Sequence, residues 1–332
     1  MGKKYWGGII GTGSYLPENI ITNSDLEKIV DTSDEWIVSR TGIKERRIAD
    51  RGMATSDLAT FAAQKAISDA QISPEDIDLI IVATVSPDMN FPSTACLVQA
   101  NIGAVNAAAF DLEAACSGFL YGLVIADQFI TNGLYKNVLV IGAECLSRFT
   151  NWKDRNTCVL FGDGAGAAIV GRVEEGYGIL FEKLGADGKG GDLLKLEAGG
   201  SRKPASLDTV EKELHYIHME GSEVFKFAVR VMASAAEQAV KLAGMENTDI
   251  DYLIPHQANL RIIEAARKRI DLSRDKVYIN LDRYGNMSSA SIPVALDEAT
   301  HSGVIKKGNN ILLVGFGGGL TWGSCLIKWS KN

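Results

Sequence analysis

The sequence has 332 residues, which is enough for about two domains of average size or one large duplicated unit. Hydrophobic residues make up 46% and charged residues 23%, and the mean hydropathy is +0.03, which argues against both a disordered chain and a membrane-embedded one. The 34 basic and 41 acidic side chains give a net charge of −7, so we expect no nucleic acid partner.

The five cysteines, at positions 96, 116, 145, 158 and 325, lack the short paired spacing of a structural zinc site or a redox motif. We therefore expect reduced thiols and no metal. The N-terminus has no apolar run that leads to a small-residue cleavage site, and the most apolar segment, residues 114–126, is too short to cross a bilayer. These features predict a cytoplasmic protein with no membrane partner.

Short apolar runs alternate with helical patterns along the chain, which is typical of a mostly parallel sheet covered by helices. The fold class is therefore α/β. An apolar helix is predicted over residues 117–130, ending at Asn132 and Gly133. Strands are predicted at residues 76–82, 107–112, 137–142, 249–254 and 310–315, with a buried pattern at 107–112.

Two of these strands, at residues 76–82 and 137–142, recur 173 residues later at 249–254 and 310–315. The shared offset predicts an internal duplication, and chance likeness between buried strands is the alternative. We predict two halves, residues 1–174 and 175–332, with a ligand site between them. Residues 185–213 have little periodicity and are interpreted as an insertion or long loop.

Cys116 stands between the predicted strand at 107–112 and the apolar helix, so its thiol is predicted at a strand-to-helix turn. A helix N-terminus offers unpaired N–H groups that stabilise a thiolate and lower its pKa, as a nucleophile requires. The alternative interpretation is a small buried hydrophobic residue, which is the usual role of a free cysteine.

His256 and Asn286 have the most site-like surroundings in the second half. His256 follows the strand at 249–254, and Asn286 lies in a turn before an apolar helix, where a plain helix N-cap is the alternative. His215 and His218 are spaced to share a helical face but lack a ligand cluster, so we interpret them as surface residues. Dinucleotide, phosphate-loop and serine-hydrolase motifs are incomplete or missing.

Three segments together resemble β-ketoacyl-acyl-carrier-protein synthase III: residues 111–119 (DLEAACSGF), 255–259 (PHQAN) and 285–289 (GNMSS). The resemblance covers nearly the whole chain. Supporting stretches lie at residues 32–37, 40–43, 155–166 and 315–323. The family implies a thiolase-like fold of two duplicated halves in five α-β-α-β-α layers, and a homodimer. Glu113 and Met287 depart from the family pattern, which leaves substrate preference open.

The resemblance implies an acyltransferase that begins fatty-acid synthesis by condensing a short acyl-CoA with malonyl-acyl carrier protein, without a cofactor. Cys116 is then the nucleophile, and the backbone amides of Cys116 and Gly318 form its oxyanion hole. His256 and Asn286 donate hydrogen bonds to the enolate that decarboxylation leaves. Acetyl, branched and longer primers all remain open.

By the same resemblance, the CoA nucleotide contacts five positions, with Trp36 and Arg155 on either side of the adenine ring: Thr32, Trp36, Arg40, Arg155 and Asn259. Residues 32–35 also read as a capping box, which places Trp36 in the first turn of a helix. Ordinary packing of this tryptophan is the alternative. Phe91 matches the position from which one subunit closes the acyl pocket of its partner.

An acidic carrier protein requires a basic patch on this acidic chain. The candidates for that docking site are Arg261, Lys268, Arg269 and Lys226, each of which could also be an ordinary solvated charge. Two other functions compete with the predicted one. Another thiolase-fold enzyme could use the same triad with CoA extenders, and a binding or scaffold protein could carry a degenerate site.

Overall fold

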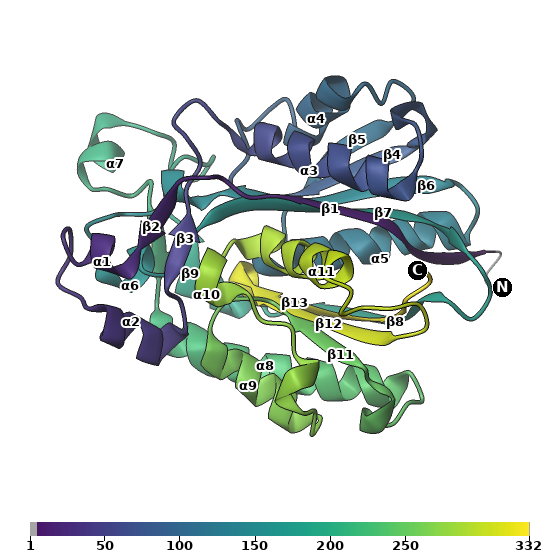
Figure 1. Cartoon of the computed structure of the whole chain (residues 1–332). Helices are drawn as coiled ribbons and strands as arrows, with labels where there is room; N and C mark the ends of the chain where they lie inside the picture. The colour runs from purple at the N-terminus through teal and green to yellow at the C-terminus, as the bar shows by residue number, and fades with distance from the viewer. Residues whose placement is uncertain (1–4, 332) are drawn as a thin grey trace.

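The computed structural model describes residues 5–331. Two β-sheets lie one above the other, with helices between them and on both outer faces, so that the molecule has five layers in the order α-β-α-β-α (Figure 1). This arrangement confirms the predicted α/β class and layer order. Within the described residues, no helix is both long enough and apolar enough to span a bilayer.

The first sheet is built from the N-terminal part of the chain, and its strands follow one another in the order β1 (Trp6–Tyr15), β7 (Asp163–Val173), β6 (Asn137–Cys145), β4 (Leu79–Ala83) and β5 (Ala108–Leu112). The strands β5, β4 and β6 are parallel, whereas β7 and β1 run antiparallel. Its outer face is covered by α3 (Thr55–Ala70) and α4 (Thr94–Ile102) (Figure 1).

The second sheet has the order β11 (Tyr252–Pro255), β12 (Asn310–Gly317), β13 (Thr321–Lys328) and β8 (Gly178–Ala186). Its outer face packs against α8 (Gly221–Leu242) and α9 (Leu260–Arg269). Between the two sheets lie α5 (Gly118–Thr131) and α11 (Ser291–His301) (Figure 1). Apolar side chains from both sheets meet in this central layer, which brings the carboxyl ends of strands from both halves together.

The duplication extends beyond the two strand pairs found in the sequence. The 3₁₀ turn η1 (Pro74–Asp76) recurs as η5 (Asn247–Asp249), and η2 (Ala115–Ser117) recurs as η7 (Ser288–Ala290), both at the same offset of 173 residues. Local contacts repeat as well: Asn137 Nδ2 donates to Asp76 O at 3.0 Å, and Asn310 Nδ2 donates to Asp249 O at 2.9 Å. The predicted internal duplication is confirmed.

Two details of the sequence interpretation were wrong. The strand at 107–112 is not buried: β5 is an edge strand, and Phe110 on it is 37% exposed in the single chain. Residues 185–213 are not merely a long loop, because they contain η4 (Gly188–Leu193), β9 (Leu194–Leu196) and α7 (Leu207–Glu211). β9 pairs with β10 (Ile217–Met219), so these short elements form a hairpin near the site.

The remaining elements flank the sheets at the end where the site lies. They are β2 (Ile20–Thr22), α1 (Asn23–Leu26), α2 (Asp34–Thr41), β3 (Glu45–Arg47), η3 (Leu146–Arg148), α6 (Arg155–Cys158), η6 (Arg274–Lys276), α10 (Leu281–Tyr284) and η8 (Gly318–Leu320).

Candidate active site

Cys116 lies in η2, directly before α5, at the strand-to-helix turn that the sequence predicted. Its side chain lines a cavity of about 380 Å³. Much of the wall is apolar, which suits a short acyl chain. The apolar lining comes from both halves of the chain and includes Val85, Leu146, Phe149, Phe161, Leu194 and Ile217.

The electrostatics of Cys116 differ from the prediction of a stabilised thiolate. Burial raises the pKa of the Cys116 thiol to about 12, and the negative charges of Glu144 and Glu113 contribute to the rise, while the Ser288 hydroxyl acts against it. The thiol is 8% exposed, so it loses more hydration energy as an anion than the start of α5 returns. The predicted lowering of the thiol pKa was therefore wrong for the unliganded chain.

A glycine-rich turn lies against the backbone of Cys116. A Cβ atom placed on Gly317 would stand 2.5 Å from Cys116 N, so only glycine permits this approach. Gly318 follows and lines the same cavity. The backbone amides of Cys116 and Gly318 are therefore on neighbouring segments of one cavity wall, as an oxyanion hole requires.

His256 follows β11 and is fixed by its backbone N–H, which donates to Val314 O at 2.8 Å. The imidazole is 1% exposed and meets the ring of Phe316 edge to face, with centroids 5.6 Å apart. Neither ring nitrogen has a hydrogen-bond partner among residues 5–331. Burial lowers the pKa of His256 from 6.5 to about 3, so the ring is neutral and can donate one hydrogen bond.

This depressed pKa predicts a pH-dependent stability. Between pH 6.5 and about 3, the unfolded chain binds a proton at His256 that the folded chain excludes. We expect the free energy of unfolding to fall by about 1.4 kcal/mol per pH unit from this group as the pH drops below 6.5, and to be unaffected by it above 6.5. Urea unfolding at pH 5.0 to 7.5 measures the slope.

The control for this measurement is His256→Gln, which keeps a polar side chain but cannot take up a proton in this range. The other three histidines titrate in both proteins, so the difference between the two slopes isolates His256. Parallel pH curves for the natural chain and the variant would contradict the prediction.

Asn286 lies in the loop between α10 and η7, and its backbone is tied to the first half of the chain. Its N–H donates to Leu160 O at 2.8 Å, and its carbonyl accepts from Gly162 N at 3.0 Å. The side-chain Oδ1 accepts from Ser288 N at 2.9 Å. Because the oxygen is engaged in this way, the amide nitrogen remains the donor that the carboxamide offers to a ligand.

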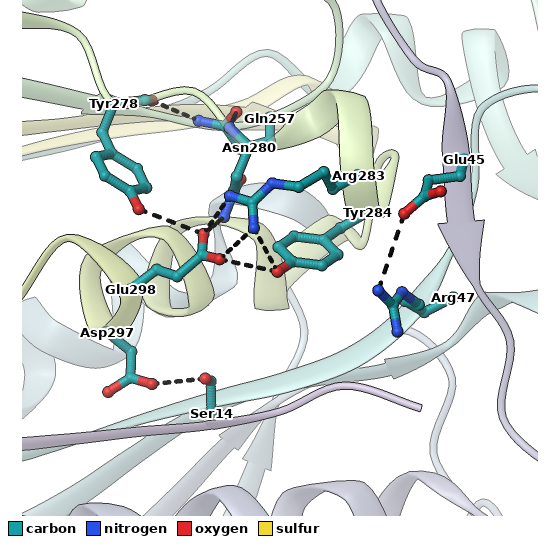
Figure 2. Close-up of polar contacts among 10 residues, drawn as sticks. All are labelled: Ser14, Glu45, Arg47, Gln257, Tyr278, Asn280, Arg283, Tyr284, Asp297 and Glu298. Carbon is teal, nitrogen blue, oxygen red and sulfur yellow. Dashed lines mark hydrogen bonds and ion pairs between the residues drawn. The ribbon is translucent and has the colours of Figure 1, made fainter. Parts of the chain in front are cut away.

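A polar network lies behind the loops that carry His256 and Asn286 (Figure 2). Gln257 accepts from Asn280 N at 3.1 Å and donates to Tyr278 O at 3.1 Å. Asn280 Nδ2 then donates to Glu298 at 2.8 Å, and Arg283 Nη1 contacts the same carboxylate at 2.6 Å. The neighbour of His256 is thereby connected to α10, which immediately precedes the Asn286 loop.

The predicted CoA residues Trp36 and Arg40 lie on α2. The N-cap is Ser33, whose hydroxyl accepts from Trp36 N at 3.1 Å, so the cap is one residue later than the predicted capping box, and Trp36 stays in the first turn. The guanidinium carbons of Arg40 and Arg155 both lie 4.9 Å from the centre of the indole. A purine stacked between Trp36 and Arg155 needs a wider gap, since each face requires about 3.5 Å.

Two other predicted CoA residues belong to the same region. Asn259 caps α9 and donates through Nδ2 to Arg40 O at 2.9 Å, so α9 begins against the end of α2. The Thr32 hydroxyl is buried and has no hydrogen-bond partner among the residues described. The structure thus brings these five predicted residues to one side of the molecule.

The four predicted docking residues divide into two kinds. Arg269 pairs with Glu237 at 2.7 Å, and Lys226 pairs with Glu223 at 2.7 Å. Arg261 and Lys268 border one shallow surface hollow and make no ion pair within residues 5–331. The second pair is therefore better suited to meet an acidic partner.

Phe91 is 85% exposed and does not line the Cys116 cavity of its own chain. His215 and His218 do not share a helix, because His218 lies in β10 and His215 precedes it. No group of three or more His, Cys, Asp or Glu side chains among residues 5–331 could hold a metal ion.

Sequence reasoning missed several residues at this site. Glu144 is fully buried on β6, and Ser288 lines the cavity beside Cys116. The β9–β10 hairpin also covers the cavity, through Leu194 and Ile217. A buried acid in an apolar strand and a serine at the repeat position of Ala115 were the available signals.

Comparison with known proteins places this chain in a family. The family model described as 3-oxoacyl-[acyl-carrier-protein] synthase III matches residues 110–188, and the model of its C-terminal part matches residues 240–329. The chain is 69% identical to the β-ketoacyl-[acyl-carrier-protein] synthase III of Caldanaerobacter subterraneus subsp. tengcongensis, with all of both chains covered.

Other relatives agree. The synthase III of Clostridioides difficile is 64% identical over 97% of this chain and 98% of its own. The crystal structure of 3-oxoacyl-[acyl-carrier-protein] synthase III from Aquifex aeolicus superposes with a TM-score of 0.90 at 51% identity, covering 97% of this chain and 100% of the other. The chain therefore belongs to the β-ketoacyl-[acyl-carrier-protein] synthase III family.

Proposed function

We propose that this chain starts fatty-acid synthesis by transferring a short acyl group from acyl-CoA to Cys116 and then condensing it with malonyl-acyl carrier protein. The family assignment supports the reaction. The single observation that carries the site assignment is the cavity at Cys116, where a nucleophilic side chain, a glycine turn and an apolar wall come together.

In the first half-reaction, Cys116 sulfur attacks the carbonyl carbon of the acyl-CoA thioester. The thiol proton is lost, the carbon–sulfur bond to CoA breaks, and CoA leaves as the thiol. The amides of Cys116 and Gly318 hold the oxyanion of the tetrahedral intermediate. The apolar wall, including Phe161, receives the acyl chain.

In the second half-reaction, the malonyl carboxylate leaves as CO₂ and its electron pair forms an enolate. His256 and Asn286 donate hydrogen bonds to the enolate oxygen, because the neutral imidazole and the carboxamide are donors at physiological pH. The enolate carbon attacks the acyl-cysteine, and Cys116 thiolate is released and takes up a proton. The products are 3-oxoacyl-acyl carrier protein, CoA and CO₂.

Both steps balance without an electron acceptor or a metal ion, so the reaction needs no cofactor beyond its substrates. The described cysteines are all free, which fits a reducing compartment and a cytoplasmic location. The two repeats are proposed as halves 1–174 and 175–332, since β7 ends at Val173 and β8 begins at Gly178.

Incubation with radiolabelled acetyl-CoA tests the proposed function. We expect one acetyl group per chain, attached to the peptide that contains Cys116 and stable to denaturation, and we expect its transfer when malonyl-acyl carrier protein is added. Label that is released on denaturation would instead identify a binding protein, and label elsewhere would contradict the role of Cys116.

A homodimer is proposed as the active form. β5 is an edge strand with unpaired backbone groups on one side, and exposed apolar side chains lie near it in sequence, including Phe91 and Val105. If two β5 edges meet, Phe91 leaves solvent and becomes available to close the acyl pocket of the partner subunit.

The proposed docking surface gives a prediction at Arg261, which lies two residues after Asn259 at the start of α9. We expect Arg261→Glu to raise the KM for malonyl-acyl carrier protein about tenfold, because it reverses a charge that attracts the acidic carrier. Acetylation by acetyl-CoA should change less than twofold. Steady-state kinetics with each substrate separate the two effects.

Lys136→Glu serves as the matched control. It makes the same change in net charge at the start of β6, which is the opposite end of that strand from Cys145 and the site. An equal loss in the control, or equal losses for both substrates in Arg261→Glu, would contradict docking at Arg261.

A further inference from the structure

The structure places an unassigned hydroxyl beside the reacting sulfur. Ser288 is 3% exposed, and its side chain lines the cavity that contains Cys116. Its backbone has a φ of +45°, a conformation that costs free energy for any residue other than glycine. Ser288 Oγ has no hydrogen-bond partner within residues 5–331.

A buried hydroxyl without a partner indicates that its partner is present only at another stage. Two groups are close enough to interact with it. Burial raises the pKa of both the Cys116 thiol and the Glu144 carboxyl, and the Ser288 hydroxyl acts against that rise in each case.

Glu144 does not need this donor. Its carboxylate already accepts from Ser86 Oγ at 2.6 Å, Ser289 Oγ at 2.9 Å and Val85 N at 3.2 Å, with Thr84 Oγ1 also at 3.2 Å. These donors occupy the acceptor positions of a carboxylate. Cys116 sulfur therefore remains as the group that the Ser288 hydroxyl can serve.

The duplication explains why this hydroxyl faces Cys116. Ser288 stands 173 residues after Ala115 and occupies the same place in the repeated turn, and both residues have a φ of +45°. The turns η2 and η7 pack against each other. A side chain at position 288 is thus directed from the second half toward the nucleophile on the first.

We propose that Ser288 is a further catalytic residue, whose hydroxyl donates a hydrogen bond to Cys116 sulfur whenever that sulfur carries negative charge. This inference rests on the proposed function, in which such charge develops twice, during attack on acyl-CoA and when the acyl-cysteine bond breaks. Ser288 keeps its own proton in both steps, since it only donates the hydrogen bond.

The rate of Cys116 alkylation by iodoacetamide tests this role without requiring acyl transfer. The modified peptide is quantified by mass spectrometry from pH 6 to 10.5 in the natural chain, Ser288→Ala and Ser288→Gly. Ser288→Gly also removes the hydroxyl but relieves the strain at positive φ, so it separates the hydroxyl from the backbone. Ser291→Ala is the loop control, because Ser291 Oγ accepts from Met287 N in the same loop and does not line the cavity.

We expect both Ser288 variants to be alkylated about ten- to a hundredfold more slowly at pH 8, with their pH profiles displaced to higher pH, while Ser291→Ala changes less than twofold. A natural rate in Ser288→Gly, or an equal loss in Ser291→Ala, would overturn the proposal. Failure of acetyl-CoA to label natural Cys116 would count against the proposed function instead, because alkylation does not depend on it.

Discussion

Cys116→Ala is expected to reduce acyl transfer from acetyl-CoA at least about ten-thousandfold, because the sulfur is the group that forms the covalent intermediate. Decarboxylation of malonyl-acyl carrier protein should persist, since its enolate contacts His256 and Asn286, which the substitution leaves in place. Covalent acetylation is measured by intact mass, and decarboxylation by release of labelled CO₂.

Cys96→Ala is the matched control for this variant. Cys96 is a free, exposed thiol on α4 and lies outside the cavity. We expect this variant to be acetylated once per chain at the natural rate. An acetyl group still bound covalently to Cys116→Ala, or a loss of labelling in Cys96→Ala, would contradict the assignment of the nucleophile.

The features that sequence predicted well are those encoded locally. Apolar runs bounded by turn residues located β6 and β12, and their common offset revealed the duplication. The turn at Cys116 followed from a strand pattern running into an apolar helix. Neighbouring residues determine each of these features, so a single sequence carries the information.

The features that sequence could not supply depend on packing between distant segments. The thiol pKa of Cys116 rises because the glycine turn of the other half and the Glu144 region enclose it, and no local pattern reports that enclosure. The hairpin of β9 and β10 joins two strands of three residues each, which are too short to give a periodic signal. The exposure of β5 depends on strand order, which apolar composition does not determine.

His256→Ala and Asn286→Ala are each expected to slow malonyl decarboxylation about a hundredfold, the effect of losing one oxyanion donor worth about 3 kcal/mol. Acetylation of Cys116 should change by only a few fold, because its oxyanion is held by the amides of Cys116 and Gly318. The two half-reactions are measured separately, by labelled CO₂ release and by intact mass after a single addition of acetyl-CoA.

Asn286→Asp makes this prediction sharper. Asn286 Oδ1 accepts from Ser288 N, so alanine removes both the donor to the enolate and a hydrogen bond that fixes the loop. Aspartate keeps an oxygen for Ser288 N but replaces the donor with a negative charge, which repels the enolate. Its decarboxylation rate should therefore fall at least as far as that of Asn286→Ala, and a rate near that of the natural chain would show that Asn286 acts through loop structure alone.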